Sequence, residues 1–182
     1  LPICPIRPCP PVWKVENLVS NIANRARYFD ADLINAWGIS IAGNKLYVVS
    51  NNNDGSEVYD MIGNKLLSIS ARNSARASAF PTGNVINTTG GFVVTNGTLT
   101  LPSLFLTCTE AGTINGYNPE VDPTNAIVVA AVTRVNAIYK GLTLAANHLY
   151  VADFYGNVID VYDQNYNLLS GFPFVDGYTI NP

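Results

Sequence analysis

Oxygen-bearing side chains recur where short apolar segments of the sequence end. Asn52, Asn53 and Asp54 follow one such segment, and Asp153 and Asn157 follow another. Because Ca²⁺ prefers carboxylate and amide oxygens, Asp54, Asp153 and Asn157 are candidate calcium ligands. The alternative is turn chemistry, in which these side chains bond nearby backbone amides and fix a corner. The sequence therefore allows two alternatives: a protein with a Ca²⁺ site, or a protein that needs no cofactor.

A second set of polar residues has the same two interpretations. Asp60, Asn118 and Asp163 each follow a tyrosine at the end of an apolar segment. We expect them to cap turns, because an Asx side chain at a strand end bonds the backbone of the following corner. Each repeat also has an earlier apolar segment, and these earlier segments end at Ser50, Cys108 and Asp153.

Nucleophile and base motifs do not accompany the single histidine. His148 follows Asn147 in a turn, and the sequence contains no Gly-x-Ser-x-Gly, His-Glu-x-x-His or phosphate-loop pattern. We therefore predict that His148 is a solvated turn residue, and we assign no catalytic residue.

The three cysteines are divided between two environments. Cys4 and Cys9 lie in a proline-rich arm, residues 1–16, where proline favours an extended polyproline conformation. A disulfide within the arm is our first expectation, and a crosslink to another chain is the alternative. The arm itself suits either a neighbouring subunit or its own domain. Cys108 lies between two threonines, and we expect it to be a buried, inert thiol.

Two sequons add to the indications of an oxidising, extracellular compartment. Asn87-Thr88-Thr89 and Asn96-Gly97-Thr98 match the acceptor pattern for N-glycosylation and lie in a Gly/Thr-rich stretch. Chance occurrence is the alternative in a chain so rich in asparagine. The sequence thus predicts glycosylation at Asn87 and Asn96.

A repeat accounts for the positions of all these residues. The segment from Gly38 to Asp60 is identical to that from Gly141 to Asp163 at 9 of 23 positions, and Leu104–Asn118 aligns without gaps to Leu149–Asp163. Each copy has an apolar strand, a polar turn and a second strand, which is the pattern of a β-hairpin. In this alignment three aromatic residues recur at one position, which suggests a core between repeats: Tyr47, Phe105 and Tyr150.

Flanking strands extend each hairpin to four strands. Such units repeat at intervals of 45 and 58 residues, from Gly38 to Gly83 to Gly141, with an insertion around residues 90–101. A four-stranded unit of this period is typical of a β-propeller blade. We predict an all-β propeller in residues 17–182, with about three blades near residues 33–75, 80–135 and 138–176. The chain is then half of a six-bladed ring or a truncated longer one.

Composition excludes several classes of protein. Of 182 residues, 48% are hydrophobic and only 13% are charged, with a net charge of −3. The low charge content argues against disorder and against a soluble helical bundle. Scattered arginines and the negative balance argue against nucleic-acid binding. No apolar run reaches the ~20 residues of a membrane span.

Several segments resemble a known protein family. Asn35-Ala36-Trp37-Gly38-Ile39, the run from Gly112 to Asn118 with Asp122-Pro123-Thr124-Asn125, and Tyr139-Lys140-Gly141-Leu142 are similar to the N-terminal half of a family of uncharacterised extracellular propeller proteins. That family is similar in style to NHL-repeat proteins, and its bacterial members often carry a C-terminal surface-sorting signal. The resemblance implies a propeller fold and an extracellular or surface location; it implies no activity.

These observations favour a structural protein that has no enzymatic activity. We predict a secreted or surface-attached scaffold that self-associates through blade edges and its N-terminal arm, as in a surface layer, filament or virion coat. The partner is a second copy or the missing half of the propeller. The alternatives are a calcium-dependent propeller hydrolase and a glycan-binding module. Less regular aromatic residues could supply a carbohydrate or subunit surface, or pack in the core: Tyr155, Tyr166, Phe172, Phe174 and Tyr178.

Overall fold

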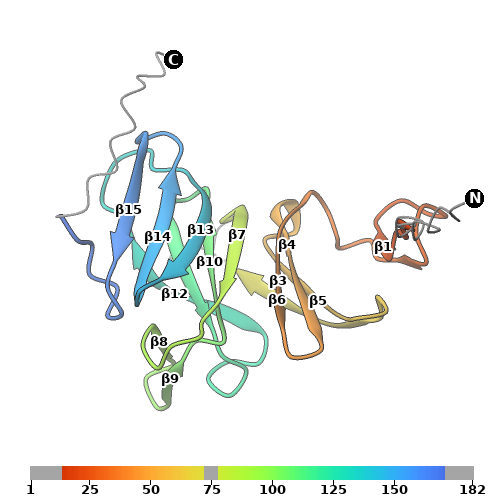
Figure 1. Cartoon of the computed structure of the whole chain (residues 1–182), viewed down its shortest axis with the longest axis horizontal. Helices are drawn as coiled ribbons and strands as arrows, with labels where there is room; N and C mark the ends of the chain where they lie inside the picture. The colour runs from red at the N-terminus through yellow and green to blue at the C-terminus, as the bar shows by residue number, and fades with distance from the viewer. Residues whose placement is uncertain (1–13, 72–77, 171–182) are drawn as a thin grey trace, which may run out of the picture.

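Strands make up nearly all the regular structure in the computed structural model of the chain. The structure describes residues 14–71 and 78–170. In these two ranges the single helical element is a 3-10 turn, Asn51–Asn53, and no helix is long and apolar enough to cross a bilayer. Most of the strands form three antiparallel meanders, here called the first, second and third sheets, which fan out side by side (Figure 1). The all-β prediction is therefore confirmed.

The first sheet is a meander of four strands: β3 (Ala36–Ala42), β4 (Lys45–Ser50), β5 (Gly55–Asp60) and β6 (Lys65–Ala71). Alternate residues of each strand point to opposite faces. Tyr47, Val58 and Ile69 therefore face the second sheet, and Ile39 and Ile41 face away from it. Two short parallel strands precede this sheet, β1 (Val19–Ser20) and β2 (Tyr28–Phe29).

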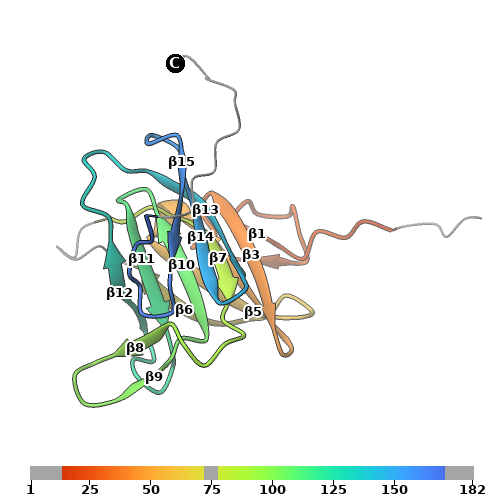
Figure 2. The ribbon, with the colours of Figure 1, turned by 60° about the vertical axis from the view of Figure 1, so that its left-hand side comes forward.

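The second sheet repeats the meander with one insertion. It contains β7 (Pro81–Ile86), β10 (Phe105–Thr109), β11 (Thr113–Tyr117) and β12 (Asn125–Ala131). The expected insertion is a hairpin of β8 (Val93–Thr95) and β9 (Thr100–Pro102), which projects below the sheet in Figures 1 and 2. The third sheet contains β13 (Tyr139–Ala145), β14 (His148–Asp153) and β15 (Val158–Tyr162). Beyond β15, one bridge from Tyr162 to Leu168 replaces the expected fourth strand.

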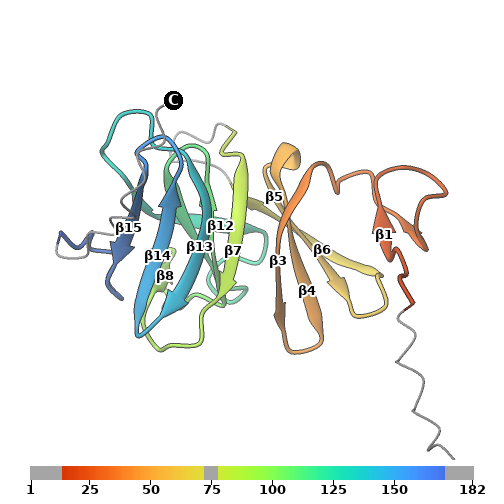
Figure 3. The ribbon, with the colours of Figure 1, turned by 45° about the horizontal axis from the view of Figure 1, so that its top comes forward.

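The first two sheets are joined at their outer edges. β6 and β12 pair in parallel over two residue pairs, so hydrogen bonds connect eight strands in the order β3-β4-β5-β6-β12-β11-β10-β7. This array turns back on itself and brings its end strands, β3 and β7, against each other. Figure 3 shows β13, β7 and β3 as neighbours across the middle of the molecule. We call these three the inner strands.

Two apolar cores lie between the sheets. In the core between the first and second sheets, the ring centre of Phe105 lies 5.3 Å from that of Tyr47 and 5.2 Å from that of Tyr117, and both pairs of rings are tilted. The core between the second and third sheets contains Leu106 and Cys108 on one side and Leu149 and Val151 on the other. Burial also raises the pKa of the Cys108 thiol to about 11, which fits the expected inert cysteine.

Repeated glycines allow the inner strands to approach. A Cβ atom at Gly38 would lie 3.0 Å from the Cα of Gly83, and one at Gly83 would lie 3.1 Å from the Cα of Gly141. These three glycines occupy the equivalent position of each repeat. In each inner strand the glycine lies within or next to a shift in the register of pairing. A side chain at Gly38 or Gly83 would push the neighbouring inner strand away, whereas one at Gly141 would meet nothing within 4 Å.

The repeat alignment is wrong by one residue in the second copy. Ala152 pairs with Ile159 across a turn of six residues, 153–158, whereas Cys108 pairs with Ile114 across five, 109–113. The first strand of that hairpin is therefore displaced relative to a gapless alignment. Leu106, not Phe105, is equivalent to Tyr47 and Tyr150, and Thr109, not Cys108, is equivalent to Ser50 and Asp153.

We predict that alanine changes the stability of the protein by different amounts at two equivalent glycines. Gly83→Ala should lower the free energy of unfolding by about 1–3 kcal/mol, because its Cβ meets the backbone of β13. Gly141→Ala is the matched control, since nothing lies within 4 Å of its Cβ, and it should change stability by about 0.5 kcal/mol or less. Urea denaturation followed by circular dichroism measures both. Equal losses for the two variants would contradict this account of the inner strands.

Candidate functional site

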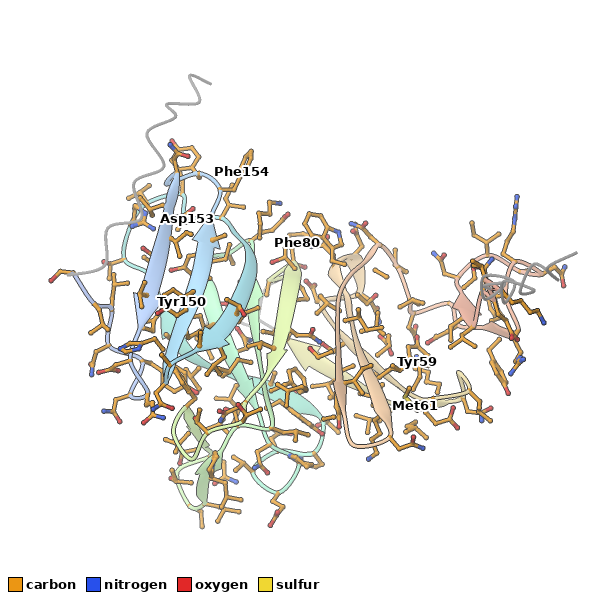
Figure 4. The ribbon with its side chains drawn as sticks, in the orientation of Figure 1. Tyr59, Met61, Phe80, Tyr150, Asp153 and Phe154 are labelled. Atoms are coloured by element: carbon orange, nitrogen blue, oxygen red, sulfur yellow. The ribbon has the colours of Figure 1, made fainter. Side chains whose placement is uncertain are left out.

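Loops from all three sheets meet at one end of the molecule. The inner strands begin there and their neighbours end there, because the antiparallel pairs are Ala36 with Ser50, Pro81 with Thr109, and Tyr139 with Asp153. Figure 4 shows Phe80, Asp153 and Phe154 toward this same end, with Tyr59 and Met61 away from it. We call this end the loop face.

One ion pair connects the three sheets on the loop face. Lys140, from β13, pairs with Glu110 in the β10–β11 turn. The Lys140 ammonium also lies 4.8 Å from the ring centre of Trp37, at the start of β3. This position favours a cation–π contact. A single lysine therefore fixes an exposed tryptophan and an acidic side chain relative to each other.

Phe80 is held on the loop face in a conformation that bulky residues avoid. Its φ is 50°, in the left-handed region. Two contacts hold it: Asp54 Oδ1 accepts hydrogen bonds from Ala79 N and Phe80 N at 3.0 Å each, and the Phe80 carbonyl accepts one from Glu110 N at 3.0 Å. Phe80 is nevertheless 40% exposed. Backbone strain of this kind collects at functional positions.

A cavity of about 470 Å³ opens beside this ion pair, between the second and third sheets. Glu110 lines one side, and Arg134, Asn136 and Tyr155 line the other. The Asn136 side-chain amide lies 3.5 Å from the Tyr155 hydroxyl, and Tyr155 is 59% exposed. The cavity thus combines an aromatic ring with an amide, a guanidinium and a carboxylate.

A buried carboxylate fixes the wall of this cavity. Asp153 Oδ1 accepts hydrogen bonds from Ile138 N and Gly156 N at 3.0 Å each, and Oδ2 accepts one from Arg134 Nε at 3.0 Å. Burial opposes its ionisation, but these hydrogen bonds and the guanidinium charge lower the pKa of Asp153 below its usual range. Asp153 is therefore a charged anchor for two loops.

Arg134 extends this network into the core. Its guanidinium lies 2.8 Å from Asp160 Oδ2, which also accepts a hydrogen bond from the Tyr139 hydroxyl at 2.7 Å. The hydroxyls of Tyr139 and Tyr162 lie 2.7 Å apart. Burial and these neighbours raise the pKa of Tyr139, so its phenol stays protonated. The charged groups here satisfy one another, which suits a rigid binding surface better than proton transfer.

Turn chemistry explains the Asx residues after each tyrosine. Asp60 Oδ1 accepts hydrogen bonds from Ile62 N and Asn64 N at 3.0 and 2.9 Å, and Asp163 Oδ1 accepts them from Asn165 N and Asn167 N at 2.8 Å each. Asn118 Oδ1 accepts one from Glu120 N at 2.9 Å. The prediction that these residues cap turns is confirmed.

The candidate calcium ligands have backbone and arginine partners instead. Asp54 holds the Ala79–Phe80 backbone, Asp153 pairs with Arg134, and Asn157 occupies a turn with φ 51°. Across residues 14–71 and 78–170, no three His, Cys, Asp or Glu side chains are grouped as metal ligands. These side chains are not brought together as one coordination site, and we derive no chemistry through Ca²⁺.

Other predicted residues lie away from the loop face. Asn87 donates hydrogen bonds to the carbonyls of Gly91 and Ser103 at 2.9 and 3.0 Å, whereas Asn96 donates one, to Val121 at 2.7 Å. A glycan replaces one amide hydrogen, so only Asn96 could carry it and keep this contact; glycosylation itself stays a prediction. His148 lies at the β13–β14 turn, where its Nδ1 is 2.8 Å from the Ala146 carbonyl oxygen. Cys4, Cys9, Phe172, Phe174 and Tyr178 lie outside the described residues.

Sequence reasoning missed the residues that build the loop face. Glu110 and Arg134 belong to no motif, and Lys140 belongs only to the Tyr139–Leu142 segment of the family resemblance. Their ion-pair partners are 19 to 30 residues away. The one local signal was the repeat, since Trp37 and Lys140 both precede a repeat glycine, as Thr82 does.

Removal of the buried charge should have a pH-dependent effect. We expect Asp153→Asn to lower the free energy of unfolding at pH 7 by about 2 kcal/mol, because Arg134 and two amides lose a charged acceptor. The folded-state pKa of Asp153 is lowered, so its contribution is present above the unfolded pKa of about 3.9 and disappears as pH falls through the folded value. The difference in unfolding free energy between the parent and Asp153→Asn should therefore shrink as the pH falls below about 4. Glu120→Gln, at an exposed position, is the control variant; a difference for Asp153→Asn that stays constant with pH would contradict the assignment.

Comparisons with known proteins support the fold and assign no activity. No family model matches the sequence. Two uncharacterised proteins of Acanthamoeba polyphaga mimivirus are 51% and 47% identical over 173 residues, which is 93% of this chain but only 43% and 46% of theirs. The chain thus spans less than half the length of these relatives.

Solved structures with a similar fold are distant in sequence. A virginiamycin B lyase from Staphylococcus aureus has a TM-score of 0.56 at 12% identity, over 76% of this chain and 41% of that one. The computationally designed Ika4 protein has a TM-score of 0.52 at 12% identity, over 86% of this chain and 78% of that one. At this identity the likeness concerns the fold alone, which is all-β and propeller-like.

Proposed function

We propose that this chain is a structural scaffold that has no enzymatic activity, and that two copies pack head to tail. In this arrangement the far face of the third sheet of one copy covers the outer face of the first sheet of the other. The outer face of the first sheet is the side of β3–β6 that carries Ile39, Ile41, Leu46, Val48 and Tyr59.

The exposure of Ile39 and Ile41 carries this proposal. They are 62% and 57% exposed on an inner strand. Their equivalents in β13 are Leu142 and Leu144, which pack against the core between the second and third sheets. Side chains that the repeat buries in the middle of the array are thus left uncovered at its end, which is typical of an interaction surface.

A groove extends this surface outward. A cavity of about 460 Å³ is lined by Ile39, Leu46 and Val48 together with Leu18 and Leu33, from the segment that precedes β3. The segment with β1 and β2 lies beyond the outer strands of the sheet (Figure 1). It therefore leaves the inner half of the face accessible.

A polar cluster limits the outer edge of the face. Lys65 Nζ lies 3.0 Å from Asp30, 2.7 Å from Asp32 and 2.9 Å from Glu57. The Tyr59 hydroxyl donates to Asp30 at 2.6 Å, and Glu57 is fully buried. An apolar centre with a polar border is the usual composition of a protein interface.

The third sheet offers a complementary far face. Its exposed residues include Thr143, Ala145, Ala152 and Ile159, which are small or apolar. Contact between two different faces is heterologous, so two copies close into a ring if the rotation permits, and otherwise they form a filament. The sheets of two copies would equal the six blades expected from the repeat.

The relatives support this proposal in two respects. More than half of each matched mimivirus protein lies beyond the matched region, which leaves room for further sheets on the same face. Their viral source favours a virion coat among the locations considered. Extracellular exposure, glycosylation and an NHL-like repeat remain part of this proposal.

Self-association under reducing conditions tests the proposal. We expect dimers or larger species of the 182-residue chain by sedimentation velocity, with dithiothreitol present to prevent crosslinks. Ile39→Ser with Ile41→Ser should weaken association at least tenfold, since each side chain contributes about 1.5 kcal/mol or more on burial. Val93→Ser with Leu99→Ser, two exposed apolar residues of the β8–β9 segment, is the control and should associate normally. A parent chain that stays monomeric at 100 µM would contradict the proposal.

A further inference from the structure

The N-terminal arm contains a regularity that a second copy can recognise. Four of its prolines are spaced by three residues: Pro2, Pro5, Pro8 and Pro11. A polyproline helix has three residues per turn, so these four would lie along one edge, and Pro10 would lie off it. A stripe of proline rings on an extended segment is a ligand of aromatic-lined grooves.

The loop face provides such an aromatic surface. Trp37, Phe80 and Tyr155 come from the three sheets and are 45%, 40% and 59% exposed. The Lys140–Glu110 pair connects them, since Lys140 lies over Trp37, Glu110 bonds the Phe80 carbonyl, and Glu110 and Tyr155 line one cavity. We propose that the proline stripe of one copy binds across this surface on a second copy.

The point where the described chain begins favours a second copy over the chain's own loop face. It leads into β1, which lies on the side of the first sheet away from the third (Figure 1), whereas the cavity is lined by residues of the second and third sheets. In the proposed head-to-tail arrangement, the first sheet of one copy faces the third sheet of the other, so its arm would begin beside that copy's cavity. The two contacts of the assembly, arm to loop face and sheet to sheet, use different residues.

Charge and rigidity also suit this ligand. Lys140 and Arg134 are balanced by Glu110, Asp153 and Asp160, which leaves one negative charge. The proline-rich part of the arm, residues 1–13, carries Arg7 and no acidic residue. The strained Phe80 backbone is fixed by Asp54, and the cavity wall is fixed by Asp153. A surface ordered in advance loses little entropy when an extended, stiff segment binds.

A synthetic arm tests the contact directly. The probe is a peptide with the sequence of residues 1–13, with both cysteines replaced by serine and Trp13 by phenylalanine. The protein is the full chain with Trp13→Phe and with Pro2, Pro5, Pro8 and Pro11 replaced by alanine, so that its own arm does not compete. Trp37 is then the single tryptophan, and its fluorescence reports occupancy. We expect saturable binding below 1 mM.

Matched variants separate this contact from nonspecific association. Tyr155→Ala should weaken peptide binding at least fivefold, while Phe29→Ala, an equally exposed aromatic outside the loop face, should not. In the peptide, Pro5→Ala with Pro8→Ala should abolish binding, and Pro10→Ala should leave it unchanged. Ile39→Ser with Ile41→Ser should still bind the peptide, which distinguishes this contact from the sheet-to-sheet one.

Three results would overturn the inference. The first is no saturable signal up to 1 mM peptide. The second is equal loss of binding for Tyr155→Ala and Phe29→Ala, or for the two proline variants of the peptide. The third is a fluorescence response to a neutral hexasaccharide with none to the peptide, which would assign the loop face to carbohydrate instead.

Discussion

The close packing of three inner strands is the constraint on which the rest of the molecule depends. Because Gly38 and Gly83 have no side chain, β3 approaches β7 and β7 approaches β13 until backbone meets backbone. This approach sets the separation of the sheets, and the separation determines which side chains fill the two cores. It also brings the start of β3 near the start of β13, so that Lys140 can reach both Trp37 and Glu110. A local backbone requirement thus positions a surface composed of residues far apart in sequence.

Polar side chains serve mainly to hold the loops that this packing brings together. Asp153 and Asp54 each accept two backbone amides, and Asp60 and Asp163 do the same one turn later in their repeats. At the buried Asp153 this makes the loop backbone part of the framework, because an unpaired buried amide costs about 1–3 kcal/mol. The aromatic rings that remain exposed are therefore presented by a rigid surface, and this rigidity is what a binding surface requires.

The strands could be predicted because they repeat. The features that depart from the repeat could not be predicted. Alternating apolar residues and a shared Tyr-Asx ending located the hairpins, since both patterns are local. The β10–β11 turn is one residue shorter than its equivalent in the third sheet, so the gapless alignment is wrong at Phe105 and Cys108. The sequence pattern alone does not show the length of a turn. Arg134 could not be predicted, since its loop shows no pattern and its partners Asp153 and Asp160 are brought near only by the sheet. The oxygen-rich turns suggested Ca²⁺ for the same reason, because sequence does not show that backbone amides already occupy those oxygens.

An array of like sheets has an inherent asymmetry that bears on assembly. Each sheet uses one face toward its predecessor and the other toward its successor, so the first sheet exposes the face that Leu142 and Leu144 bury in the third. In the assembly proposed above, these end faces are covered by more sheets of the same kind, in one chain or in a second copy. Because the two end faces differ, any such contact has direction. A directional contact either closes a ring or continues as a filament, and an arm that binds outside the sheets could strengthen either one.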